Sequence, residues 1–97
     1  MSLLPIASPA FLRKKKKLFP DFQKKIDIHV RRLLENPLLG EPKKGVLHGI
    51  RVLKFKYKNQ LFLLSYEPDF RNKLLYLYTF GSHERFYEEL ERYLKSK

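Results

Sequence analysis

The fold is decided by the stretch Leu53-Lys54-Phe55-Lys56-Tyr57-Lys58, in which apolar and basic side chains alternate. A period of two places neighbouring side chains on opposite faces of an extended chain. The stretch therefore predicts a β-strand with one buried face and one basic face. Because the lysines point away from the core, we expect part of the sheet to be open and basic.

The residues that follow extend this strand into a meander. Asn59-Gln60 predicts a tight turn, and the near-continuous apolar run from Leu61 to Tyr66 predicts a central strand. A polar turn over Glu67 to Asn72 separates it from a last strand over Lys73 to Phe80. One face of that last strand is expected to carry Leu74, Tyr76, Tyr78 and Phe80.

The residues before the alternating stretch predict a short strand and a helical hairpin. Leu3 to Ala7 is the strand, and Ser8-Pro9 is a helix N-cap followed by proline at the first helical position. This helix ends near Phe19-Pro20, and a second helix runs from Pro20-Asp21 to Asn36-Pro37. The apolar stripe of the second helix consists of Phe22, Ile26, Val30, Leu33 and Leu34.

The chain between Leu38 and Gly49 is expected to be an irregular connection, and a final helix is expected from Ser82 to about Lys95. Phe86, Leu90 and Tyr93 would point from that helix to the core. The element order β-α-α-β-β-β-α defines an α+β fold. We expect one domain over residues 1–97, with a small, mostly antiparallel sheet, an N-terminal helical hairpin and a C-terminal helix.

Charge is the strongest clue to function. The net charge is +11, and it is unevenly distributed: residues 1–58 hold 15 Lys or Arg against 4 Asp or Glu, whereas residues 59–97 hold 6 of each. Such asymmetry indicates a polyanionic partner, nucleic acid first and an acidic protein second. Cysteine is absent, which excludes disulfides and thiol chemistry, and no stretch reaches membrane-spanning length. We expect a cytoplasmic protein.

One segment combines residues suited to proton transfer and substrate contact. His83 and Tyr87 lie four residues apart in Gly81-Ser82-His83-Glu84-Arg85-Phe86-Tyr87, a spacing that would place them on one helix face. Imidazole gives and takes protons near neutral pH, and a phenol can donate to phosphate or stack on a base. The structural alternative is a capping histidine and a packing tyrosine, and composition alone favours it.

The cations of the first half supply groups for phosphate binding. Arginine can hold a phosphate with two parallel hydrogen bonds, and lysine is a compact point charge. For the strand cations, the alternative is a solvated strand face that discourages edge pairing. For the run from Arg13 to Lys17, the alternatives are a solvated helix face and a binding site for an acidic partner protein. No spacing of ligands predicts a metal site, and His29 is interpreted as structural. The candidate cations are Arg51, Lys54, Lys56, Lys58, Lys43, Lys44 and the run Arg13, Lys14, Lys15, Lys16 and Lys17, with His48 as a secondary candidate.

The chain resembles the RelE/ParE toxin superfamily of bacterial type II toxin–antitoxin systems over nearly its whole length. The resemblance includes the helix end Leu33-Leu34-Glu35-Asn36-Pro37 with Gly40 after it, the stretch from Leu47 to Lys56, and Leu63 to Glu67. Its most specific part is the segment from Gly81 to Tyr87.

The resemblance implies a metal-independent endoribonuclease that uses no cofactor, cuts mRNA on the ribosome and is blocked by a cognate acidic antitoxin. By position, His83 resembles the general acid or base, and Tyr87 the residue that orients substrate. Arg51 and Lys54 resemble the cations that stabilise phosphate, and Arg85 could add another.

Two other functions remain open. Some branches of the superfamily poison DNA gyrase instead of cutting RNA, and such a toxin would not need His83. The third reading is a basic RNA- or ribosome-binding module without catalysis, which would show salt-sensitive binding and no cleavage.

Overall fold

The computed structural model describes residues 3–84 and 86–95, without the side chain of Tyr93. Within these residues, the strands form one sheet of order β1-β5-β4-β3-β2, in which β1 is parallel to β5 and the other neighbours are antiparallel. The mostly antiparallel α+β fold is thus confirmed. The elements are β1 (Leu4–Ala7), α1 (Pro9–Lys16), α2 (Pro20–Glu35), β2 (Glu41–Pro42), the 3₁₀ turn η1 (Gly45–Leu47), β3 (Arg51–Tyr57), β4 (Gln60–Asp69), β5 (Leu74–Ser82) and α3 (Phe86–Lys95).

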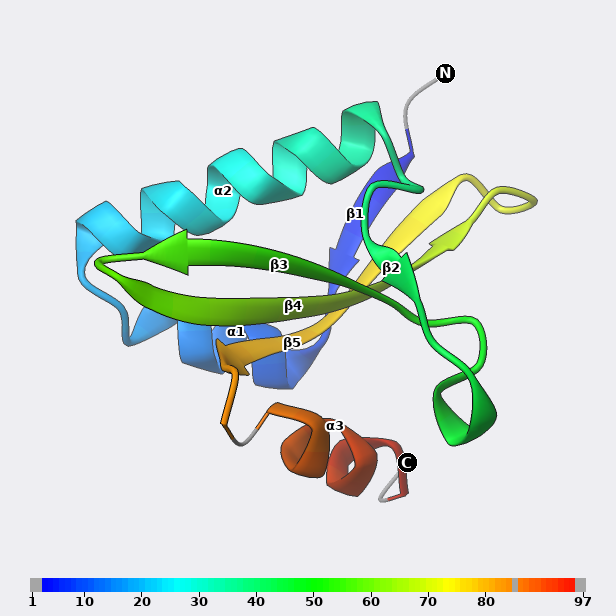
Figure 1. Ribbon diagram of the computed structural model, residues 1–97. Helices are drawn as coiled ribbons and strands as arrows, with labels where there is room; N and C mark the ends of the chain where they lie inside the picture. The colour runs from blue at the N-terminus through cyan, green and yellow to red at the C-terminus, as the bar shows by residue number, and fades with distance from the viewer. Residues whose placement is uncertain (1–2, 85, 96–97) are drawn as a thin grey trace.

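The helical hairpin begins as the sequence predicts. The Ser8 hydroxyl accepts a 3.0 Å hydrogen bond from the Phe11 amide, and Pro9 occupies the first helical position. Pro20 likewise opens α2. In Figure 1, α2 lies along one face of the sheet and α3 lies on the opposite side.

The sheet therefore has a core on each face. Facing α1 and α2, the larger core packs helix residues such as Ile26 and Leu33 against Phe55 and Leu64. The smaller core joins α3 to the other face, and it consists of Leu47, Ile50, Val52, Leu63, Phe86 and Leu90. The predicted inward direction of Phe86 and Leu90 is confirmed, whereas the Tyr93 side chain lies outside the described residues.

The predicted face of β5 is wrong. Ser65 pairs with Thr79, but the next residue, Tyr66, pairs with Leu77, so Tyr78 is left over as a bulge. At this bulge the Ser65 hydroxyl forms hydrogen bonds with the backbone of β5. It donates to the Thr79 carbonyl and accepts from the Thr79 amide, both at 3.2 Å. The bulge shifts the alternation, so Leu75, Leu77 and Phe80 belong to the larger core.

Several boundaries also differ from the predictions, including the ends of α1 at Lys16 and of β5 at Ser82. Lys58 and Asn59 both have positive φ, so they form the turn between β3 and β4, one residue earlier than predicted. β4 continues through the predicted polar turn to Asp69, and the connection after α2 contains β2 and η1. Helix α3 begins at Phe86, which leaves His83 in the preceding turn and not on the helix.

A buried tyrosine ties the end of α2 to the sheet. Tyr66 is fully buried, and its hydroxyl accepts from the Gly40 amide at 2.8 Å and donates to the Pro37 carbonyl at 2.7 Å. A Cβ at Gly40 would lie 2.7 Å from the Tyr66 ring and 2.9 Å from the Val52 carbonyl oxygen. Glycine is therefore required where the chain passes the tyrosine.

Replacing Tyr66 with Phe should lower the free energy of unfolding by about 1–3 kcal/mol, because the Gly40 amide loses its partner in a buried site. Urea unfolding followed by circular dichroism measures the change. Tyr57→Phe is the matched control, since its hydroxyl donates to Asp21 at an exposed site and its loss should matter less. Equal losses in the two variants would contradict the assignment.

His29 is the one predicted structural histidine, and its surroundings agree with that interpretation. The ring is buried 4.4 Å from the Phe55 ring, its Nδ1 lies 3.1 Å from an Arg32 nitrogen, and its Nε2 has no hydrogen-bond partner among the described residues. Burial first, and then the charges of Arg32 and Lys25, lower the pKa of His29. The folded protein therefore disfavours the imidazolium.

This shift predicts acid sensitivity. Below about pH 6.5 the unfolded chain binds a proton that folded His29 resists, so stability should fall as the pH falls through this window down to the lowered folded pKa. His29→Leu should reduce that slope. Urea unfolding at several pH values between about 5.5 and 7.5 tests it, and an unchanged slope in the variant would count against it.

Candidate functional site

An uncovered part of the sheet lies on the face that carries α3. The buried side chains of Val52 and Leu63 on this face pack against α3, whereas Lys54 and Lys56 on the same face of β3 are exposed. The predicted split of β3 into a buried and a basic face is therefore confirmed. Cross-strand register aligns Lys54 with Leu63 and Gly81, and Lys56 with Leu61.

His83 lies at the end of the Lys56 row. Its backbone amide donates to the Leu61 carbonyl at 3.1 Å, which extends the β4–β5 ladder by one bond and fixes the turn. The imidazole is exposed. Adjacent strands are about 4.8 Å apart, so Lys56 and His83 are separated by about 10 Å across two strand spacings. A shallow hollow of about 240 Å³ adjoins His83, lined by Asn59, Gln60, Leu61, Ser82, His83 and Glu84.

Tyr87 lies on the same face, but on the β2 side. Its ring is half-buried and edge-on to Phe86, with centroids 5.1 Å apart, and Lys43 Nζ is 5.3 Å from its centroid. Glu41 links this position to Lys54: its two carboxylate oxygens lie 4.0 Å from Lys43 Nζ and from Lys54 Nζ. Lys43, Lys54 and Tyr87 therefore form one cluster around Glu41.

Glu41 is absent from the predicted site. Nothing in its local sequence marks it, because its neighbours are brought near only by the pairing of β2 with β3. Its carboxylate partly balances two lysines, and an incoming phosphate would compete with it for them.

Arg51 is on the opposite face of β3 from Lys54, although it lines a hollow at the strand end together with Lys43 and His48. It precedes Val52 on β3 and is therefore on the α1/α2 side, where Nε donates to the Gly40 carbonyl at 2.9 Å and a terminal nitrogen donates to the Leu38 carbonyl at 3.0 Å. These bonds anchor the loop after α2, next to Tyr66. The structure does not bring Arg51 together with Lys54 and His83, and we leave it out of the candidate site.

The remaining predicted residues are spread over other surfaces. Lys58 is in the β3–β4 turn with its Nζ 5.5 Å from the Tyr57 ring centroid, which belongs to the α1/α2 side. Lys44 and His48 are exposed at the two ends of η1, and His48 precedes the start of β3. Arg85 lies outside the described residues.

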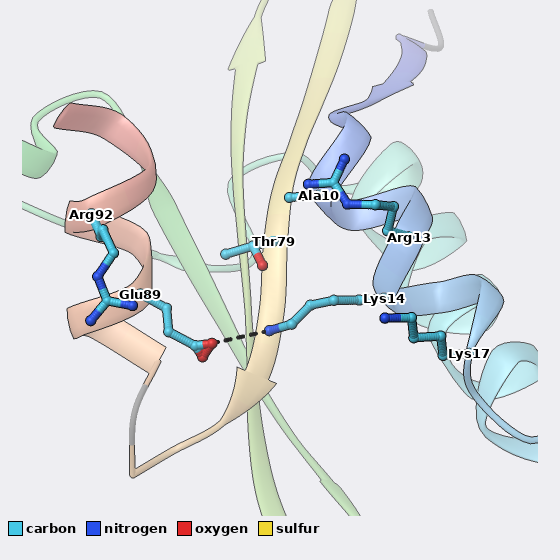
Figure 2. Close-up of a pocket in the computed structure, with 7 residues that line it drawn as sticks. All are labelled: Ala10, Arg13, Lys14, Lys17, Thr79, Glu89 and Arg92. Carbon is cyan, nitrogen blue, oxygen red and sulfur yellow. Dashed lines mark ion pairs between the residues drawn. The ribbon is translucent and has the colours of Figure 1, made fainter. Parts of the chain in front are cut away.

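The basic side chains of α1 point in different directions, some toward α2 and others toward α3. Lys15 pairs with Asp27 on α2, and Lys16 is exposed. Arg13, Lys14 and Lys17 instead line a hollow between α1 and α3 (Figure 2). The five cations therefore do not form one stripe.

The arrangement suits chemistry on a phosphate. Lys54 and Lys56 offer fixed positive charge, and an exposed imidazole lies in the adjoining turn. Among the described residues, no group of three or more His, Cys, Asp or Glu side chains is placed to hold a metal ion. No helix in the described part of the chain is long and apolar enough to cross a membrane.

Solved structures that this chain resembles include bacterial toxins. A mutant of the E. coli toxin RelE in the free state, in which two arginines are replaced by alanine, superposes with a TM-score of 0.77 at 14% identity, over 99% of this chain and 97% of that chain. The RelBE2 toxin–antitoxin complex of Mycobacterium tuberculosis gives 0.71 at 16% identity, over 86% and 100%. The E. coli mutant bound to the antitoxin peptide RelBc gives 0.70 at 16%, over 92% and 94%. The chain thus has the RelE toxin fold.

The sequence also identifies the family to which this toxin fold belongs. Residues 6–91 match the family described as ParE-like toxin of type II bacterial toxin–antitoxin system. The chain belongs to that family and is a type II toxin. Comparison with curated protein sequences gives no significant match.

Replacing Arg51 with Met should destabilise the fold by about 1 kcal/mol or more, since two charged hydrogen bonds to carbonyl groups are lost. The affinity of the folded variant for RNA should stay within about twofold of wild type. Urea unfolding and fluorescence anisotropy separate the two effects. Unchanged stability with weakened RNA binding would instead indicate that Arg51 is part of the RNA-binding surface.

Proposed function

We propose that the protein is an endoribonuclease toxin that cleaves mRNA in the cytoplasm by attack of the 2′-hydroxyl on the adjacent phosphorus. The observation that carries the proposal is the position of His83. Its backbone amide is bonded to Leu61, so the residue continues the row that contains Lys56, and its imidazole is exposed. The proposal is supported by an exposed imidazole next to the strand row whose face carries two exposed lysines.

The proposed reaction uses these groups in separate roles. As the 2′ oxygen bonds to phosphorus, negative charge grows on the phosphoryl oxygens, and Lys54 and Lys56 stabilise it. The bond from phosphorus to the 5′ oxygen then breaks. His83 in its protonated form gives a proton to this leaving oxygen, and solvent takes the proton of the attacking hydroxyl.

Tyr87 and Lys43 are proposed to position the substrate. The half-buried ring is held by Phe86 and so presents a fixed aromatic surface next to a cation. A base can stack on such a ring, while Lys43 contacts an adjacent phosphate. Binding of RNA would draw Lys43 and Lys54 away from Glu41, because the phosphate replaces its carboxylate.

The proposed partners follow from the family and from the charge. Several of the similar structures are complexes with antitoxins, so we propose a cognate antitoxin with an acidic segment as the inhibitor. The net charge of +11 complements such a segment as well as RNA. The ribosome is the proposed setting for cleavage.

His83→Ala should lower the rate of RNA cleavage by about 10²-fold or more and should abolish growth inhibition, because the proton donor is lost. Primer extension on mRNA after induced expression measures cleavage, and circular dichroism checks the fold. His48→Ala is the matched control, since His48 is also exposed but precedes β3 and lies off the Lys56 row. Full toxicity in folded His83→Ala would refute the role.

A second function is favoured by the family description, which is ParE-like. A toxin of the gyrase-poisoning kind would act on DNA gyrase and would leave mRNA intact. Supercoiling assays with purified gyrase distinguish the two functions. Inhibition of supercoiling that persists in His83→Ala, without cuts in mRNA, would replace the nuclease proposal.

A further inference from the structure

The hollow between α1 and α3 has a volume of about 480 Å³ and is unusually basic. It is lined by Ala10, Arg13, Lys14, Lys17, Thr79, Glu89 and Arg92. Figure 2 shows α1 on one side and α3 on the other, with β5 between them and Thr79 at the floor. Thr79 is buried, whereas Arg13 and Lys17 are exposed at the rim.

The hollow exists because β1 covers only half of β5. β1 pairs with β5 from Leu74 to Leu77, so the rest of β5 is an edge. Helix α1 satisfies this edge through side chains: the Ser8 hydroxyl donates to the Tyr78 carbonyl at 2.5 Å, and Lys14 Nζ donates to the Phe80 carbonyl at 2.7 Å. This hydrogen bond holds the ammonium group of Lys14 at the edge of β5.

The charges around the hollow are not balanced. Lys14 Nζ lies 3.5 Å from a carboxylate oxygen of Glu89, and Arg92 is paired with Glu88 at 3.0 Å. Among the described residues, neither Arg13 nor Lys17 forms an ion pair. In the part of the chain that the structure describes, two unpaired cations therefore lie beside Lys14, whose one anionic partner there is the partly exposed carboxylate of Glu89.

Strand β5 connects the hollow to His83, because Thr79 lines the hollow and His83 is four residues further along the chain. A Cβ at Gly81 would lie 3.2 Å from Lys14 Nζ. Because glycine has no side chain, the Lys14 ammonium group can lie against the backbone at this position. Gly81 is two residues before His83, which corresponds to about 7 Å of strand. A polyanion bound at His83 can therefore continue along the edge of β5 into the hollow.

We propose that this hollow is a second phosphate-binding site, which holds a neighbouring phosphate of the RNA strand that reaches His83. The choice of RNA as the ligand rests on the nuclease proposal. The guanidinium of Arg13 and the ammonium of Lys17 bind phosphate oxygens, and the phosphate displaces Glu89 from Lys14. The exposed Lys14–Glu89 pair is weak, so its loss costs little.

The test measures binding of a short fluorescein-labelled single-stranded RNA in the His83→Ala background, where cleavage cannot interfere. Arg13→Gln with Lys17→Gln should weaken binding and reduce the slope of log affinity against log salt by about 0.7, since each neutralised phosphate of a single strand contributes about 0.7 and the hollow holds one phosphate. Lys24→Gln with Arg31→Gln is the matched control, because both side chains are exposed on α2 and the charge change is equal.

Glu89→Gln should change the RNA affinity in the opposite direction. Removing the competing carboxylate should raise RNA affinity at least about twofold. Glu91→Gln is its control: it lies on the same helix but lines a different hollow, with Val46, Leu94 and Lys95. All variants change exposed or partly exposed side chains, and thermal melting checks that each is folded.

The outcomes separate this proposal from the nuclease function. Equal salt slopes in the two double variants would overturn the second site even if the protein with His83 intact cleaves RNA. Hollow-dependent RNA binding without cleavage would refute the nuclease and support the site. Binding of a polyglutamate peptide that needs Arg13 and Lys17, with RNA binding indifferent to them, would overturn the choice of RNA.

Discussion

The structure depends on one constraint: the middle of β4 has no solvent-facing side. Leu63, Leu64, Ser65 and Tyr66 are all buried, although neighbouring residues of a strand point to opposite faces. Both faces of the sheet must therefore be covered at this point. Helices α1 and α2 cover Leu64 and Tyr66, and α3 with the chain around η1 covers Leu63. The two layers seen on either side of the sheet in Figure 1 follow from this requirement.

Because α3 is short, it covers only part of its face, and the uncovered part becomes the candidate site. Val52 lies under the covered region, while Lys54 and Lys56 lie outside it. The same alternation sends Arg51 to the other face, where it binds backbone carbonyls of the loop after α2. Cations adjacent in sequence thus have separate functions: Lys54 and Lys56 face the proposed substrate, and Arg51 supports the fold.

Local signals predicted much of the fold. Ser8 with Pro9, the α2 stripe and the lysine alternation each depend on contacts within a few residues, so they can be read directly. The bulge at Tyr78 could not be read, because it depends on how Ser65 and Thr79 meet. The start of α3 at Phe86 was also missed. Ser82 and His83 remain with the sheet through the bond to Leu61, which competes with the helix for the same residues.

By itself the sequence determined the presence and order of the helices and of the meander strands, the basic character and the segment that holds His83, since each of these rests on the identity and order of neighbouring residues. Only the tertiary structure decided that Glu41 joins Lys43 to Lys54, that Arg51 leaves the site, and that Arg13 and Lys17 face α3 across a hollow. The physical reason is the separation of the partners. The bonds from Ser8 and Lys14 to β5 span 70 and 66 residues, and no local pattern carries such a contact.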